Sequence, residues 1–191
     1  MRKNILLGSA LLFAASAMGQ VSKDITLEDI WAKGTFQMKT ISSIRSMNDG
    51  EHYCVMTRNG IEKYAYKTGE KEADMCLFNP PGTKKAAPLP PVESYAFDNN
   101  ERQILLSTGF EPIYRHSGVS DYYLYNIEDG SMTKISSNGK QRLTTFSPDG
   151  KRTAFVRENN LYIYDIAADK EIQVTSDGKM NAIINGTTDW V

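Results

Sequence analysis

The feature that most constrains this chain is a polar turn that recurs three times, roughly fifty residues apart. The turns occupy residues 47–50, 97–100 and 146–150. Runs rich in β-branched and aromatic residues follow at 53–58, 103–108 and 153–157, and second runs follow at 61–66, 122–127 and 161–166. Each second run leads into another polar turn, such as Lys67-Thr68-Gly69. This pattern predicts three repeated units of antiparallel strands.

Repeats of about forty to fifty residues with several strands each are typical of β-propeller blades. A blade buries its faces against neighbouring blades, and propellers have about four to eight of them. We therefore predict an all-β fold, a partial β-propeller of about three to four blades, in a protein that continues past Val191. The alternative is a small β-sandwich complete within residues 20–191, in which the strand spacing is coincidental.

Two long excursions between the strands favour the propeller over the sandwich. Residues 79–91 are rich in proline and are expected to form a stiff connector between blades, with a polyproline ligand as the alternative. Residues 109–121 form a second long insertion, which we expect to be a loop. Long loops on a repeat scaffold often carry a functional site.

The first residues have the pattern of a secretory signal peptide. Basic Arg2 and Lys3 precede an apolar stretch at 5–17, and small residues lie three and one positions before Gln20. About thirteen apolar residues are too few for a membrane anchor, which needs about twenty. Residues 1–19 are therefore predicted to be cleaved, and residues 20–191 to be exported to the periplasm, the cell surface or the medium.

One short helix is expected after the signal peptide. Thr26 is a suitable N-cap, Glu28 and Asp29 place negative charge in the first turn, and Gly34 provides a stop.

The charge and the cysteine and histidine content limit the expectations for nucleic-acid binding, disulfides and metal sites. The chain has 22 Lys+Arg and 23 Asp+Glu, so no broad basic surface for nucleic acid is expected. Cys54 and Cys76 are the only cysteines; buried free thiols are the favoured interpretation, and an export-linked disulfide is the alternative. With only His52 and His116 beside them, no metal site or other cofactor is predicted.

The sequence has no catalytic motif, so binding is the chemistry to look for. A G-x-S-x-G nucleophile elbow, an H-E-x-x-H motif, a P-loop and a G-x-G-x-x-G motif are all absent. Arg115 lies in the middle of the 109–121 insertion, and its planar guanidinium suits carbonyl or carboxylate oxygens. A solvated surface arginine is the alternative. Near the end, Asn185-Gly186 predicts a turn before Trp190.

Two stretches carry a family resemblance. Tyr114-Arg115-His116-Ser117 and residues 183–191 closely resemble the N-terminal β-propeller of the dipeptidyl peptidase IV family, in the prolyl oligopeptidase class of serine peptidases. Thr26-Leu27-Glu28-Asp29 is similar to the start of the first blade in that family. The resemblance spans residues 24–191.

The resemblance implies an eight-bladed propeller that covers an α/β-hydrolase domain, and an exopeptidase that removes N-terminal Xaa-Pro or Xaa-Ala dipeptides from peptides. It implies that Arg115 binds a substrate carbonyl, that His116 supports Arg115, and that the protein forms a homodimer. The family's paired glutamates and its Ser-Asp-His triad would lie beyond Val191, so the hydrolase domain is expected to be absent here and the chain alone to be inactive. The alternatives are a non-catalytic periplasmic propeller that serves as a scaffold for protein partners, and a β-sandwich binding module.

Overall fold

The computed structural model describes residues 24–38, 40, 43–79, 89–115 and 117–188. The predicted signal peptide, the middle of the proline-rich connector, His116 and Trp190 lie outside these residues. The chain divides into two units, Met1–Thr40 and Ile41–Val191, and each is described by itself.

The first unit contains the predicted short helix, α2 (Leu27–Trp31). Thr26 is its N-cap: the Thr26 hydroxyl oxygen accepts a hydrogen bond from the Asp29 backbone N–H at 3.1 Å, and the Asp29 carboxylate accepts one from the Thr26 N–H at 3.3 Å. This reciprocal capping box satisfies two backbone donors that a helix start leaves unpaired. The helix ends at Trp31, and its C-cap Ala32 lies two residues before Gly34.

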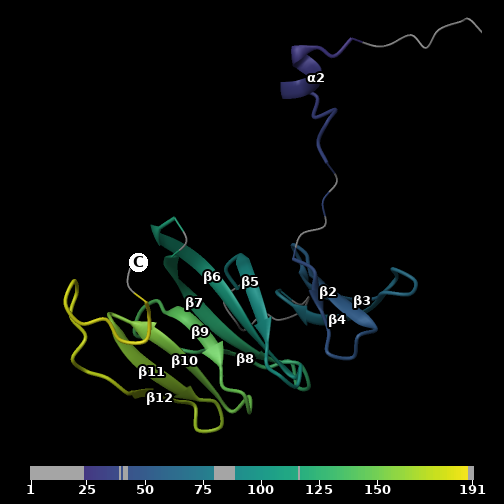
Figure 1. Cartoon of the computed structure of the whole chain (residues 1–191). Helices are drawn as coiled ribbons and strands as arrows, with labels where there is room; N and C mark the ends of the chain where they lie inside the picture. Colours follow the sequence, from purple (N-terminus) through teal and green to yellow (C-terminus); the bar gives the residue numbers. More distant parts are fainter. Residues whose placement is uncertain (1–23, 39, 41–42, 80–88, 116, 189–191) are drawn as a thin grey trace, which may run out of the picture. The chain divides into compact units, whose positions relative to one another are not determined.

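The second unit consists of antiparallel sheets of four consecutive strands (Figure 1). The first sheet contains β1 (Arg45–Ser46), β2 (His52–Met56), β3 (Gly60–Ala65) and β4 (Lys71–Leu77). The second contains β5 (Val92–Phe97), β6 (Gln103–Tyr114), β7 (Ser117–Asn126) and β8 (Met132–Lys134). The third contains β9 (Arg142–Phe146), β10 (Arg152–Arg157), β11 (Asn160–Asp165) and β12 (Lys170–Gln173). Three such sheets in the described residues confirm the predicted all-β, partial-propeller fold.

The recurring turn joins the first two strands of each sheet. In every copy the N–H of the fourth residue donates to the carbonyl of the first: Gly50 to Met47, Glu101 to Asp98, and Gly150 to Ser147. The fourth residue has a positive φ in all three copies, and Glu101 adopts it (φ 55°) where the other turns have glycine. The second turn is therefore 98–101, one residue later than the sequence pattern suggested.

Neighbouring turns are linked by side-chain amides, which we call the amide ladder. Asn48 Nδ2 donates to the Asn99 carbonyl at 2.9 Å, and Asn99 Nδ2 donates to the Pro148 carbonyl at 2.9 Å. The three residues hold the same position in their turns. Pro148 has no amide side chain, so it accepts from the second turn and donates nothing onward.

The sheets pack in series, with the second sheet between the other two. Alternate residues of β6 supply the two cores: Ile104 and Leu106 pack with Cys54 and Ile61 of the first sheet, whereas Leu105 packs with aromatic residues of the third. The core on the side of the third sheet contains Leu105, Leu124, Ile135, Phe155, Tyr162 and Tyr164. A sandwich has two sheets, so the sandwich alternative is wrong for the described residues.

Both cysteines are free and buried, as the favoured interpretation predicted. Cys54 is 0% exposed and Cys76 is 1% exposed, and both belong to the core shared with the second sheet. They behave as small apolar residues of that core.

Candidate functional site

The predicted loop at 109–121 is wrong, because most of it is strand. Strands β6 and β7 continue past the last pairing of β6 with β5, at Thr108, and form a hairpin that we call the arm (described residues 109–115 and 117–120). Its pairs include Glu111 with Val119 and Tyr114 with Ser117. Sequence patterning missed the strands because Gly109, Pro112 and Gly118 interrupt the apolar alternation.

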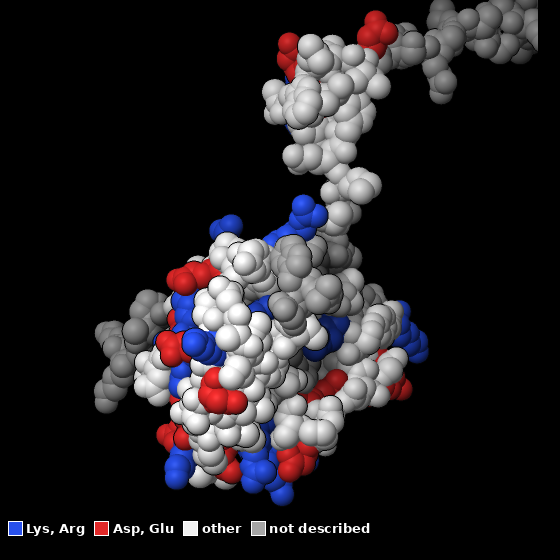
Figure 2. All heavy atoms as spheres, turned by 60° about the vertical axis from the view of Figure 1, so that its left-hand side comes forward, with Lys and Arg blue, Asp and Glu red and all other residues white. Residues whose placement is uncertain are grey.

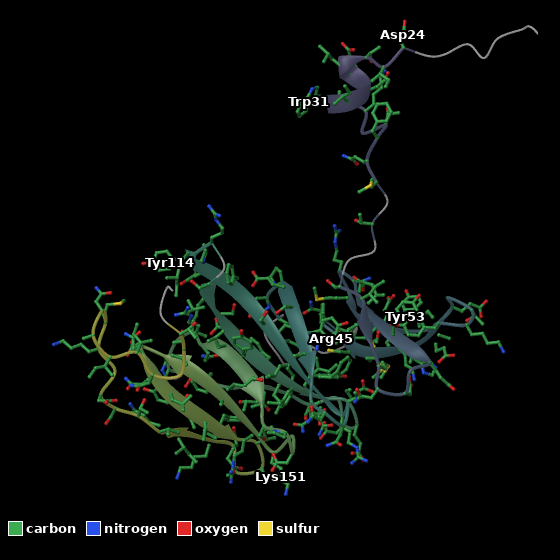
Figure 3. The ribbon with its side chains drawn as sticks, viewed as in Figure 1. Asp24, Trp31, Arg45, Tyr53, Tyr114 and Lys151 are labelled. Atoms are coloured by element: carbon green, nitrogen blue, oxygen red, sulfur yellow. The ribbon has the colours of Figure 1, made fainter. Side chains whose placement is uncertain are left out.

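Arg115 lies at the turn of the arm, between the ends of β6 and β7. Its side chain is exposed, and it forms no hydrogen bond or ion pair with another described residue. Figure 3 shows the neighbouring Tyr114 at the tip of the arm and Lys151 at the opposite end of the sheets. The guanidinium is therefore presented at one end of the second sheet, where it can donate hydrogen bonds to an incoming oxygen.

The base of the arm is held by side chains from two other segments. The Glu93 carboxylate, from β5, accepts a hydrogen bond from the Phe110 N–H at 2.9 Å. Lys140, from the connector between β8 and β9, donates to the Gly109 carbonyl and forms an ion pair with Glu111 at 2.9 Å. Neither Glu93 nor Lys140 lies in a motif, so the sequence offered no signal for these contacts.

A buried glutamine attaches the other strand of the arm to the connector before β9. Gln141 is 0% exposed, and its backbone exchanges hydrogen bonds with that of Ser120 at 2.8 and 2.9 Å. Its side-chain oxygen also accepts from the Tyr122 N–H at 3.2 Å. Through these hydrogen bonds, the β7 strand of the arm is anchored to a buried residue beside the second sheet.

Glycine is required inside the arm at one position. A Cβ added at Gly118 would lie 2.2 Å from the Phe110 ring and 2.6 Å from the Glu111 carbonyl oxygen. The ring of Phe110 therefore lies directly on the backbone of the opposite strand.

The second candidate stretch packs on the third sheet. The predicted turn at Asn185-Gly186 is present, with φ 72° at Gly186, whose backbone approaches Val156 and Leu161. Asn185 N–H donates to the Asn159 carbonyl at 3.0 Å. Asn159 lies in the turn from the second to the third strand of its sheet, the equivalent place to the tip of the arm, so both candidate stretches lie at the same end of neighbouring sheets (Figure 1).

Among the described residues, the other surface features are weaker candidates for the functional site than this end of the sheets. A hollow of about 340 Å³ is lined by Glu101, Arg102, Ile127 and Glu128, which lie at the opposite end, beside the recurring turn. On the face shown in Figure 2, Lys and Arg side chains alternate with Asp and Glu over the sheets. In the described part of the chain, no cluster of three His, Cys, Asp or Glu side chains is arranged to hold a metal ion.

Comparisons with known proteins give a family match for part of the chain, together with similar relatives and solved structures. Residues 98–191 match the family described as the dipeptidyl peptidase IV N-terminal region. The crystal structure of Porphyromonas gingivalis dipeptidyl peptidase 4 is similar, with a TM-score of 0.74 and 36% identity, over 88% of this chain and 24% of that one. Human prolyl endopeptidase FAP is 25% identical over 87% of this chain and 21% of its own length. Dipeptidyl aminopeptidase B of Saccharomyces cerevisiae is 33% identical over 52% of this chain and 12% of its own length.

The chain thus spans about a quarter or less of the length of these relatives. None of the helical segments in the described part of the chain has the length and apolar character that a bilayer crossing requires.

Proposed function

Because residues 98–191 match the dipeptidyl peptidase IV N-terminal region and the chain is similar in fold to part of a dipeptidyl peptidase 4, we propose that it is the substrate-positioning portion of a serine exopeptidase. The reaction is removal of Xaa-Pro or Xaa-Ala dipeptides from the N-termini of peptides. One observation carries the proposal: the arm presents Arg115 exposed at its tip, at the same end of the sheets as the 183–188 stretch.

Arg115 has the chemistry that substrate positioning needs. Its planar guanidinium can donate charge-assisted hydrogen bonds to a substrate carbonyl oxygen. Such a contact fixes the peptide relative to the nucleophile and so lowers the entropic part of the barrier. His116, the next residue, supports Arg115 in this proposal. The nucleophile, acid-base groups and oxyanion donors belong to an α/β-hydrolase domain encoded beyond residue 191.

The domain arrangement and the partners are part of the same proposal. Residues 1–19 serve as a cleaved export signal, and residues 20–191 form the first blades of the propeller. The partners are peptides with penultimate Pro or Ala, the hydrolase domain, and a second copy of the protein in a homodimer. Export places the enzyme where extracellular or periplasmic peptides are its substrates.

The test is Arg115→Ala in the complete protein that contains this chain, assayed with a Gly-Pro chromogenic amide. Loss of charge-assisted hydrogen bonds worth about 1.5–3 kcal/mol lowers kcat/KM about ten- to hundredfold. Arg102→Ala is the matched control, since Arg102 is exposed at the opposite end of the second sheet.

Unchanged kcat/KM in Arg115→Ala would refute the role of Arg115. A complete protein that lacks activity altogether would instead favour the non-catalytic propeller scaffold.

A further inference from the structure

The arm leaves the second sheet through a break in the hydrogen-bond ladder. Pairing of β6 with β7 shifts between Thr108 and Glu111, so Gly109 and Phe110 lie opposite a single residue of β7. Gly109 has φ 60°, a conformation that side-chain-bearing residues seldom adopt. A bulge of this kind bends its strand and leaves backbone groups without ladder partners. The direction of the arm therefore depends on what satisfies those groups.

Two oppositely charged side chains satisfy them from different segments. Glu93 is itself the extra residue of a bulge in β5, where the pairing with β6 shifts between Val92 and Ser94, and its carboxylate accepts from the Phe110 N–H at 2.9 and 3.1 Å. Lys140 comes from the connector before β9, donates to the Gly109 carbonyl and pairs with Glu111 at 2.9 Å. Hydrogen bonds to charged groups are stronger than those between neutral groups.

These contacts reach the arm from separate parts of the fold. Glu93 is 17 residues before Phe110, and Lys140 is 31 residues after Gly109. A rotation of the arm about the bulge separates at least one charged group from its backbone partner. Beyond the bulge, the Phe110 ring lies against Gly118, so the two strands of the arm move together.

We propose that Glu93 and Lys140 form a charge clamp that sets the direction of the arm and thereby positions Arg115 for substrate. Both are positioning residues that act through Arg115, and this part of the inference rests on the proposed function. Glu93 is exposed and the Lys140 side chain is 24% exposed, so the clamp is accessible to salt. High ionic strength therefore loosens the arm.

The first test measures amide hydrogen exchange of the arm in the complete protein, without reference to activity. Lys140→Met and Glu93→Ala each raise exchange of residues 109–120 at least severalfold, while exchange of the third sheet stays unchanged. Lys140→Arg, which keeps the cation, restores protection. Lys134→Met is the matched control, because Lys134 pairs with Asp121 at 2.9 Å below the bulge. Raising the salt concentration increases arm exchange in the wild type and has little effect in Lys140→Met.

The second test is a double-mutant cycle on hydrolysis of the Gly-Pro amide. Lys140→Met lowers kcat/KM roughly tenfold in the wild type, because displacement of a positioning group by about an ångström costs that much or more. It has no further effect when Arg115 is already Ala, since the clamp acts through Arg115. A general structural role would lower activity equally in both backgrounds.

The two tests separate the clamp from the proposed function. Arm exchange equal to wild type in both Lys140→Met and Glu93→Ala overturns the clamp, even if the protein is an active peptidase. Faster arm exchange in a protein without peptidase activity keeps the clamp as the device that holds the arm and rejects its role in positioning substrate. Equal loss of activity in both backgrounds of the cycle also rejects that role.

Discussion

At the scale of single residues, the Arg157–Glu171 ion pair of the third sheet also binds Ser136 and so attaches the connector before β9 to that sheet. The Arg157 guanidinium donates to the Glu171 carboxylate at 3.0 Å and to the Ser136 hydroxyl at 2.8 Å. It also stacks over the Tyr162 ring, 4.1 Å from its centroid. With side chains only 9% and 17% exposed, Arg157 and Glu171 form a pair that is shielded from solvent on most sides. Hydrogen bonds from Arg157 lower the pKa of Glu171.

We expect Glu171→Gln to remove part of the acid sensitivity of folding. A carboxyl whose pKa is lower in the folded state stabilises the fold above its unfolded pKa, about 4.3, and this stabilisation is lost as pH falls through the folded value. The variant should therefore be less stable than wild type by about 1–2 kcal/mol at pH 7, with a smaller difference at pH 3. Urea unfolding between these pH values measures it.

Glu128→Gln is the control for this pH series, because Glu128 is exposed. A stability difference for Glu171→Gln that stays the same at pH 3 and pH 7 would contradict the linkage.

At the scale of elements, the amide ladder joins turns that the sequence pattern treats as separate. Each turn is specified locally, by its hydrogen bond from the fourth residue to the first and by the positive φ at the fourth position. The link between turns has a different origin, because Asn99 reaches Pro148 across 49 residues of chain. The conformation of each turn can therefore be predicted from the sequence, whereas the packing of one turn against the next cannot.

Asn99→Ala should weaken the contact between the second and third sheets. The variant loses one side-chain hydrogen bond, and we expect a decrease of about 0.5–1.5 kcal/mol in the free energy of unfolding. Asn100→Ala is the matched control: it changes the next residue of the same turn, which is also exposed and which donates to the Asp98 carboxylate only through its backbone N–H. Chemical denaturation of both variants gives the comparison, and equal effects would argue against the ladder.

At the scale of the second unit, the two cysteines report on the packing of the first two sheets. Cys54 and Cys76 lie in the core that joins these sheets. Burial raises the pKa of the Cys54 thiol to about 11 and that of Cys76 to about 12. Since the thiolate is the reactive form, both side chains are protected by burial and by protonation together.

We expect neither thiol to react with an alkylating reagent at pH 8 while the fold is intact. Both should become reactive together when denaturant separates the sheets, because they share one core. Mass spectrometry of alkylated protein across a urea series measures the two sites independently. Rapid labelling of either cysteine without denaturant would show that the core opens locally, contrary to this expectation.

Much of the fold was predictable because its signals are local. The strands after each recurring turn, the N-cap at Thr26 and the Asn185-Gly186 turn were all identified from short patterns of residues. The arm was mistaken for a loop, since its glycines and Pro112 break the alternation that marks strands. In the structure a bulge accommodates Gly109, and Pro112 pairs with Gly118, so the hairpin continues past all three residues.

The sequence by itself determined the repeated pattern of strands and turns, and it placed Arg115 in an exposed insertion. These features follow from turn preferences and side-chain alternation, which act between neighbouring residues. Only the tertiary structure decided that Glu93 and Lys140 meet at the base of the arm and that Asn99 reaches Pro148. It also decided that the cysteines stay unpaired. The physical reason is register: which distant side chains meet depends on how strands pair and sheets stack, and a shift of one residue would exchange every such partner.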